Sequence, residues 1–173
     1  MNLGPYWPYI EDISRQRLAN NKTSRHIPND GQLELIGAAG ELAARLFYGL
    51  STELGVHFDG GHDFEVGDIT VDVKATPMTG GAAYRYLQWP TWKEIKAQII
   101  VMTIINVKQM TGTLVGFATK EQILASFVNK SRATVCYEIP YVKLSACWEL
   151  QVREDLRKMR LPCSIVGSLI CPE

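Results

Sequence analysis

The sequence contains no long hydrophobic run, no net charge and no closely spaced cysteine pair. Its longest apolar stretch, residues 99–107, is interrupted by Thr103 and Asn106, and its length suits a buried strand better than a membrane span. The first residues have neither the basic start nor the apolar stretch of a signal peptide. We therefore expect a cytoplasmic protein with no membrane partner.

The absence of net charge means that the overall field does not favour a polyanionic partner. Basic residues nevertheless cluster in residues 13–26, where no acidic residue occurs, and in residues 153–160. Such clusters bind phosphates in some proteins and form solvated helix faces in others, and the sequence leaves this choice open. Buried free thiols are expected because no Cys-x-x-Cys spacing occurs, although the bias of the cysteines toward one end keeps a metal site open. These cysteines are Cys136, Cys147, Cys163 and Cys171.

Hydrophobic periodicity predicts an α/β (α+β) fold with a central mixed β-sheet of about five strands flanked by helices. Helices are expected at residues 9–21, from a cap at Asn29 or Asp30 to Gly49, after Thr119 with Phe127 facing inward, and at 148–159, with one helical turn at 92–97. Strands are expected at residues 64–66, 69–73, 84–88, 99–105, 113–118, 135–139 and 164–170.

The register of the hairpin at residues 64–73 follows from its turn. With a two-residue turn at Gly67-Asp68, pairing runs outward from Val66 and Ile69 until Asp63 lies opposite Asp72. Because side chains alternate along each strand, the apolar residues share one face of the hairpin. The other face then carries Asp63, Glu65, Thr70, Asp72 and Lys74.

Two facing aspartates have a chemical consequence. Their side chains would begin about 5 Å apart, and like charges so placed are destabilising unless they share a proton or a cation. Converging carboxylates suit a hard divalent cation such as Mg²⁺, with Mn²⁺ as a substitute, because such ions take oxygen ligands. Lys74, further along the same face, is placed to touch a phosphate or an attacking water.

This pattern resembles the PD-(D/E)xK nuclease superfamily, in which an Asp on one strand precedes an Asp/Glu-x-Lys tripeptide on the next. Here the match is Asp63 followed by Asp72-Val73-Lys74, and Gly40-Glu41 on the preceding helix corresponds to the Glu that members often add. The resemblance covers about residues 33–127. It departs from the family pattern at Gly61-His62, where a Pro often precedes the first Asp.

The resemblance implies a restriction-endonuclease-like core within a single nuclease domain, residues 1–173. The core would span about residues 30–130, with an N-terminal helical extension at 1–29 and a C-terminal strand-helix-strand elaboration at 131–173. Asp63, Asp72 and Glu41 would be Mg²⁺ ligands, and the catalytic set would be Asp63, Asp72, Lys74 and Glu41.

Other acidic residues compete for these roles. Asp68 belongs to the turn in the register above and Asp59 to a loop, but a shifted hairpin would exchange the assignments. A second tripeptide, Glu94-Ile95-Lys96, is rejected because no paired carboxylate precedes it.

We therefore expect a Mg²⁺-dependent DNA endonuclease that hydrolyses phosphodiester bonds in double-stranded or branched DNA. A homodimer is a further expectation, because cutting both strands requires two sites. Substrate contacts are expected from Gln88, Arg85, Lys93 and Lys96, beside aromatic residues that either stack on a strand or pack inside.

Two alternatives stay open. The first is a non-catalytic nucleic-acid-binding or structural protein that retains the nuclease fold, in which the polar hairpin face is solvated and Glu41 pairs with Arg45 at i, i+4. The second is a hydrolase with the same metal site whose substrate is not a nucleic acid.

Overall fold

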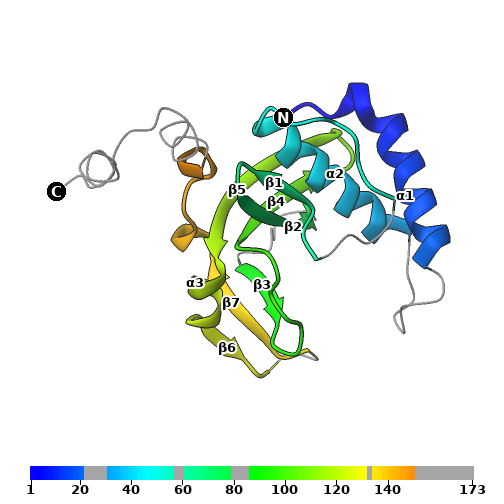
Figure 1. Ribbon diagram of the computed structural model, residues 1–173. Helices are drawn as coiled ribbons and strands as arrows, with labels where there is room; N and C mark the ends of the chain where they lie inside the picture. Colours follow the sequence, from blue (N-terminus) through cyan, green and yellow to red (C-terminus); the bar gives the residue numbers. More distant parts are fainter. Residues whose placement is uncertain (22–30, 57–60, 79–85, 132–133, 151–173) are drawn as a thin grey trace.

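The computed structural model describes residues 1–21, 31–56, 61–78, 86–131 and 134–150, which form two β-sheets and three α-helices (Figure 1). The larger sheet is mixed and has four strands in the order β1-β2-β4-β5, with β2 and β4 parallel and the other neighbours antiparallel. The smaller sheet is antiparallel with the order β3-β7-β6. The fold is therefore mixed α+β.

The bounds of the strands agree with the predicted positions in most cases. The strands are β1 (Phe64–Val66), β2 (Ile69–Pro77), β3 (Tyr86–Pro90), β4 (Ile99–Asn106), β5 (Thr111–Thr119), β6 (Phe127–Asn129) and β7 (Cys136–Pro140). The prediction of a single central sheet of about five strands was wrong, because β3 pairs with β7 and not with a strand of the larger sheet. Phe127, expected to face inward from a helix, lies exposed in β6.

The helices are α1 (Trp7–Asn21), α2 (Gly31–Phe47) and α3 (Lys120–Leu124), with short 3₁₀ helices at Gly4–Tyr6 and Tyr141–Lys143. Thr119 caps α3 as predicted, in a reciprocal capping box with Gln122. The turn predicted at residues 92–97 is not helical. Three predictions lie outside the described residues: the N-cap of α2 at Asn29 or Asp30, most of the helix at 148–159, and the strand at 164–170. The described start of that last helix, residues 147–150, is helical.

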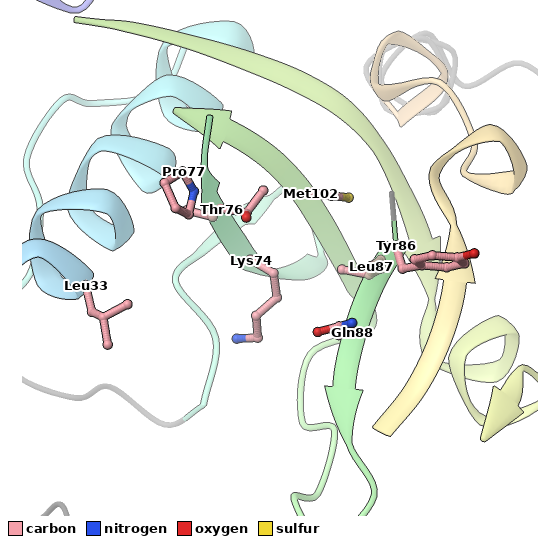
Figure 2. A pocket seen from close by; sticks show the side chains of 9 residues that line it. Leu33, Lys74, Thr76, Pro77, Tyr86, Leu87, Gln88 and Met102 are labelled. Carbon is pink, nitrogen blue, oxygen red and sulfur yellow. The ribbon is translucent and has the colours of Figure 1, made fainter. Parts of the chain in front are cut away.

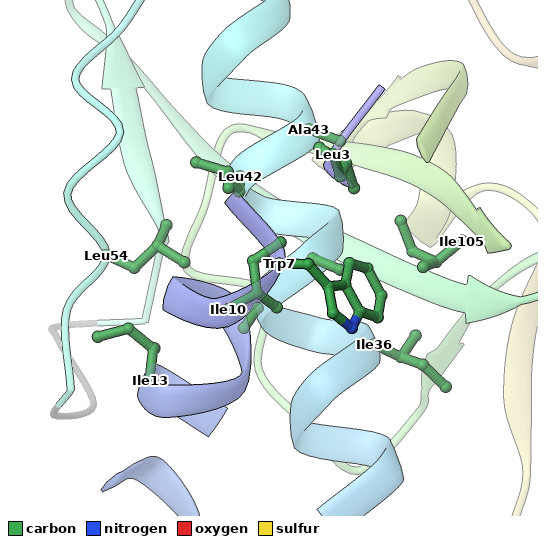
Figure 3. Close-up of a cluster of buried hydrophobic side chains, with 11 residues drawn as sticks. Leu3, Trp7, Ile10, Ile13, Ile36, Leu42, Ala43, Leu54 and Ile105 are labelled. Atoms are coloured by element: carbon green, nitrogen blue, oxygen red, sulfur yellow. The ribbon is translucent and has the colours of Figure 1, made fainter. Parts of the chain in front are cut away.

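Helix α2 covers one face of the larger sheet, and α1 packs against α2. Trp7, Ile10 and Ile13 of α1 pack with Ile36 and Leu42 of α2 in a cluster of fully buried or nearly buried side chains (Figure 3). A second cluster on this face joins the end of α2 to the strands through Tyr48, Phe64, Val71, Val101 and Phe117. No helix in the described part of the chain is long and apolar enough to span a membrane.

The smaller sheet covers the other face of the larger one. Leu87 and Trp89 of β3 pack against Ile100 and Met102 of β4. Because β2 and β4 run parallel with Asp72 beside Ile100 and Lys74 beside Met102, the polar residues of β2 face the smaller sheet. The candidate site therefore lies where the two sheets meet.

Candidate active site

The predicted hairpin register is confirmed over its three strand pairs. Phe64 lies opposite Val71, Glu65 opposite Thr70, and Val66 opposite Ile69. Gly67 has a φ of 62°, a left-handed conformation that favours glycine in a two-residue turn. Asp68 is therefore a turn residue, while Asp59 lies outside the described residues.

Asp63 departs from the predicted pairing with Asp72. Counted outward from the turn, the last paired residue of β1 is Phe64, and Asp63 is the next residue beyond it. Its backbone N–H donates to the Val71 carbonyl at 2.8 Å, and its carboxylate Oδ2 accepts from the Val73 N–H at 2.6 Å. The side chain of Asp63 thus takes a position that a backbone carbonyl would occupy in a continued ladder. These two bonds fix its carboxylate against the edge of β2.

Asp72 and Lys74 form an ion pair on the face of β2 that meets the smaller sheet. Asp72 is only 7% exposed, so this part of the hairpin is not the solvated polar face of the alternative interpretation. The Lys74 Nζ also lies 4.6 Å from the centre of the buried Trp89 ring, within the range of a cation–π contact. The Trp89 indole is itself anchored by a 2.7 Å bond from its Nε1 to the Lys93 carbonyl.

Glu41 approaches Asp63 from α2 and is held by two arginines. Arg17 of α1 donates to its Oε2 at 2.7 Å, and Arg45, one turn later on α2, donates to its Oε1 at 3.0 Å. Arg45 also donates to the Asp63 carbonyl at 2.7 Å. The buried Glu41 is therefore a junction between α1, α2 and the start of the hairpin, and not an isolated carboxylate.

The carboxyl group of Asp63 has a raised pKa. Burial, followed by the negative charges of Asp72 and Glu41, raises the pKa of Asp63 from 3.8 to a net value of about 7. The Val73 N–H and the Lys74 ammonium lower it, but by less than the other effects raise it. Asp72 and Glu41 therefore each lie close enough to Asp63 to repel its carboxylate, although Asp63 does not continue the predicted strand pairing.

The raised pKa of Asp63 should make the stability of the protein depend on pH. Because the pKa of Asp63 is higher in the folded than in the unfolded chain, the folded state binds the proton more tightly, and the free energy of unfolding should fall as pH rises from about 4 to about 7. Asp63→Asn should remove this loss, which we expect to exceed about 1 kcal/mol since one pKa unit is about 1.4 kcal/mol. Urea unfolding at pH 5 and pH 8 measures the effect.

The matched control is Asp12→Asn, on the exposed side of α1. It should keep the wild-type difference between pH 5 and pH 8. Equal pH dependence in Asp63→Asn and the wild type would contradict the assignment of the raised pKa to this carboxyl.

Of the residues expected to contact substrate, Gln88 lies beside Lys74. Both line a cavity of about 350 Å³ between β2, β3 and the start of α2 (Figure 2). Lys93 and Lys96 are exposed on the segment after β3. Lys93 Nζ lies 5.1 Å from the centre of the Trp89 ring, and the stem of Lys96 packs against Gly61. Arg85 lies outside the described residues.

Sequence reasoning missed Arg17 as a neighbour of the site, and it left open whether Trp89 stacks on a strand or packs inside. Arg17 was grouped with a basic cluster, but it lies four residues after the buried Ile13 and so continues the buried side of α1. Trp89 alternates with Leu87 in β3, and this period of two would have marked it as buried. In each case hydrophobic periodicity was the available signal.

The donor chemistry of the two aspartates fits a divalent cation. Asp63 uses Oδ2 for Val73 and Asp72 uses Oδ1 for Lys74, and within the described residues the second oxygen of each has no bonded partner. A cation between these oxygens would offset the repulsion that raises the pKa of Asp63. Both oxygens of Glu41 accept from arginines, so its fit as a direct ligand is poorer.

A ready-made cluster of three His, Cys, Asp or Glu side chains able to hold a metal is absent from the described residues. Cys136 and Cys147 are buried and are not in a disulfide, as expected, and Cys163 and Cys171 lie outside the described residues.

No protein-family model matches the chain, and neither a curated protein nor a solved structure is significantly similar to it.

Proposed function

We propose that the chain is a divalent-metal-dependent nuclease of the PD-(D/E)xK type, with Asp63, Asp72 and Lys74 at its active site. One observation carries the proposal: the hairpin brings two repelling aspartates and a lysine together at the edge of β2, beside a cavity. The order of helix α2, hairpin and further strands also supports this type, although the second sheet is an addition that the resemblance did not imply.

Asp63 and Asp72 would hold Mg²⁺ or Mn²⁺. Bound there, the ion would supply a Lewis acid that lowers the pKa of a water and neutralises charge on the phosphate. Glu41 would act through water, or by keeping Arg45 on the Asp63 carbonyl. The substrate under this proposal is DNA, and the homodimer expected for double-strand cleavage is part of the proposal.

Lys74 would bind the scissile phosphate. Its ammonium already lies against Asp72 and over the Trp89 ring, so its direction is set before substrate arrives. In hydrolysis, water forms a new bond to phosphorus while the bond to the 3′ oxygen breaks, which leaves a 5′-phosphate on one product. An ammonium fixed beside the phosphate stabilises the negative charge that grows on its oxygens in this step.

A non-catalytic nucleic-acid-binding role is the second candidate, and one observation favours it. The charges of Glu41 and Asp72 are compensated inside the chain by Arg17, Arg45 and Lys74. Such compensation is typical of a structural ion-pair network as well as of an active site.

The experiment that tests the proposal is incubation of the purified chain with supercoiled plasmid, single strands and four-way junctions, with Mg²⁺ or with EDTA. We expect cleavage with Mg²⁺ and none with EDTA, and products that carry a 5′-phosphate. Binding of these DNAs without cleavage under any divalent ion would favour the second candidate, and neither binding nor cleavage would contradict both.

A further inference from the structure

The cavity beside Lys74 has the size and lining of a small-ligand site. Its volume is about 350 Å³, and binding sites for small ligands begin at about 300 Å³. Aliphatic walls come from four elements, and the polar groups of Lys74 and Gln88 lie at one side (Figure 2). The aliphatic residues used here are Leu33 of α2, Pro77 of β2, Leu87 of β3 and Met102 of β4.

Gln88 presents a fixed hydrogen-bond acceptor to this cavity. Its Nε2 donates to Glu138 Oε1 at 2.8 Å, and Glu138 Oε2 accepts from Asn129 Nδ2 at 3.1 Å. Because the nitrogen of Gln88 faces Glu138, its amide oxygen turns the other way. Figure 2 shows this oxygen on the side of Lys74. The buried Glu138 thus sets the direction of the amide.

We propose that this cavity binds one unpaired nucleotide of the DNA substrate, next to the scissile phosphate. The inference rests on the proposed nuclease function and adds its substrate class. A nucleotide matches the lining from end to end: its phosphate meets the Lys74 ammonium, its flat base lies between aliphatic side chains, and a donor on the edge of the base meets the oxygen of Gln88. The volume of about 350 Å³ suits one base better than a base pair.

The consequence is a preference for DNA that is already locally unpaired. Extracting a base from a continuous duplex breaks stacking and pairing, and this cost is smallest at bulges, flaps and single strands. The protein should therefore favour such substrates over an uninterrupted duplex of the same length.

The test compares binding of three fluorescently labelled duplexes to the full chain, with Ca²⁺ replacing Mg²⁺ and gels confirming that the DNA stays intact. The first duplex is continuous, the second carries one unpaired adenosine, and the third carries an abasic nucleotide at that place. We expect the adenosine bulge to bind roughly tenfold more tightly than the other two, since contacts to one base are worth about 1–3 kcal/mol. Equal binding of the adenosine and abasic bulges would overturn the proposal.

A matched pair of variants locates the effect. Leu33→Glu places a carboxylate at the wall of the cavity and should reduce the tenfold preference to less than about twofold, while Leu33→Met should retain it. Leu124→Glu is the control, because Leu33 and Leu124 are both helical and are 54% and 50% exposed, respectively. A preference that survives in Leu33→Glu, or that Leu124→Glu also removes, would overturn the assignment to this cavity.

The failure of this inference differs from the failure of the proposed function. If Mg²⁺ supports cleavage but continuous and bulged duplexes bind equally, the nuclease stands and the nucleotide site is wrong. If no DNA is cleaved but the bulge preference depends on Leu33, the cavity is a nucleotide site and the catalytic proposal is wrong.

Discussion

Replacing Asp72 by asparagine should abolish phosphodiester cleavage without lowering the stability of the fold. Asparagine has the same shape but lacks the charge that a divalent cation requires, so we expect cleavage to fall by at least about 100-fold. The same change removes one of the two negative charges that raise the pKa of Asp63. The free energy of unfolding at pH 8 should therefore stay equal or rise.

Opposite effects on activity and stability are what an active site built from repelling charges produces. A purely structural ion pair would behave differently, because losing Asp72 would then lower stability along with any other property. Plasmid cleavage and urea unfolding, measured on one preparation, separate the two cases. Wild-type cleavage in Asp72→Asn would remove this residue from the site.

Lys74→Met removes the other partner of the ion pair with Asp72 and should affect both cleavage and stability. Cleavage should fall by about 100- to 1,000-fold, because a fixed positive group beside the phosphate is lost. Stability should now fall by about 1–3 kcal/mol, since the mostly buried Asp72 loses its cation, although solvent around the partly exposed lysine limits this cost. Lys108→Met, in the turn between β4 and β5, is the control and should change neither property.

The hairpin could be predicted from sequence because its information is local. A two-residue turn at Gly67-Asp68 and strict alternation on both sides determine which residues pair, and the observed register agrees. The residue at which this pairing ends is instead determined by contacts that are distant in the sequence. Asp63 leaves the ladder and bonds to Val73 through its carboxylate, in surroundings that α2 supplies through Glu41 and Arg45.

The main error of the sequence prediction was to place all strands in one sheet. This error also arose because the deciding contacts are not local in the sequence. A strand was predicted at residues 84–88 and is observed at residues 86–90, but its partner is β7, with Gln88 opposite Glu138 across fifty residues of chain. Alternation identifies a strand and its buried side without naming the strand beside it. The cavity beside Lys74 depends on this long-range pairing, so sequence alone placed Gln88 near the site but could not describe its surroundings.

Glu41 illustrates how far the candidate site itself could be predicted. Its position on a helix before the hairpin was expected, whereas its pair with Arg45 at i, i+4 belonged to the alternative without a metal site. The second arginine comes from α1, whose packing against α2 brings Arg17 to the carboxylate. Such contacts between elements follow from packing and not from spacing within one segment.

Gly40 should be the position of α2 that is least tolerant of a side chain. A Cβ there would lie 2.4 Å from Ala75 Cβ in β2 and 2.6 Å from Thr103 Oγ1 in β4, which is closer than these atoms can approach. Thr103 is fully buried and Ala75 has no flexible side chain that can move aside. The helix would have to shift away from the sheet, and overpacking of this kind costs about 1–3 kcal/mol.

Gly37, one turn earlier on the same helix, provides the matched comparison. A Cβ at this position meets no atom within 4 Å, so Gly37→Ala should raise the free energy of unfolding by about 0.5–1 kcal/mol through helix propensity alone. Gly40→Ala should lower it despite the same gain in propensity, and urea unfolding of the two variants measures the difference. Because Glu41 follows Gly40 directly, a shifted α2 would also move the carboxylate that contacts Arg45, so cleavage by Gly40→Ala should fall even where it is folded. Equal stability of the two variants would show that α2 does not lie against β2 and β4 as closely as the site requires.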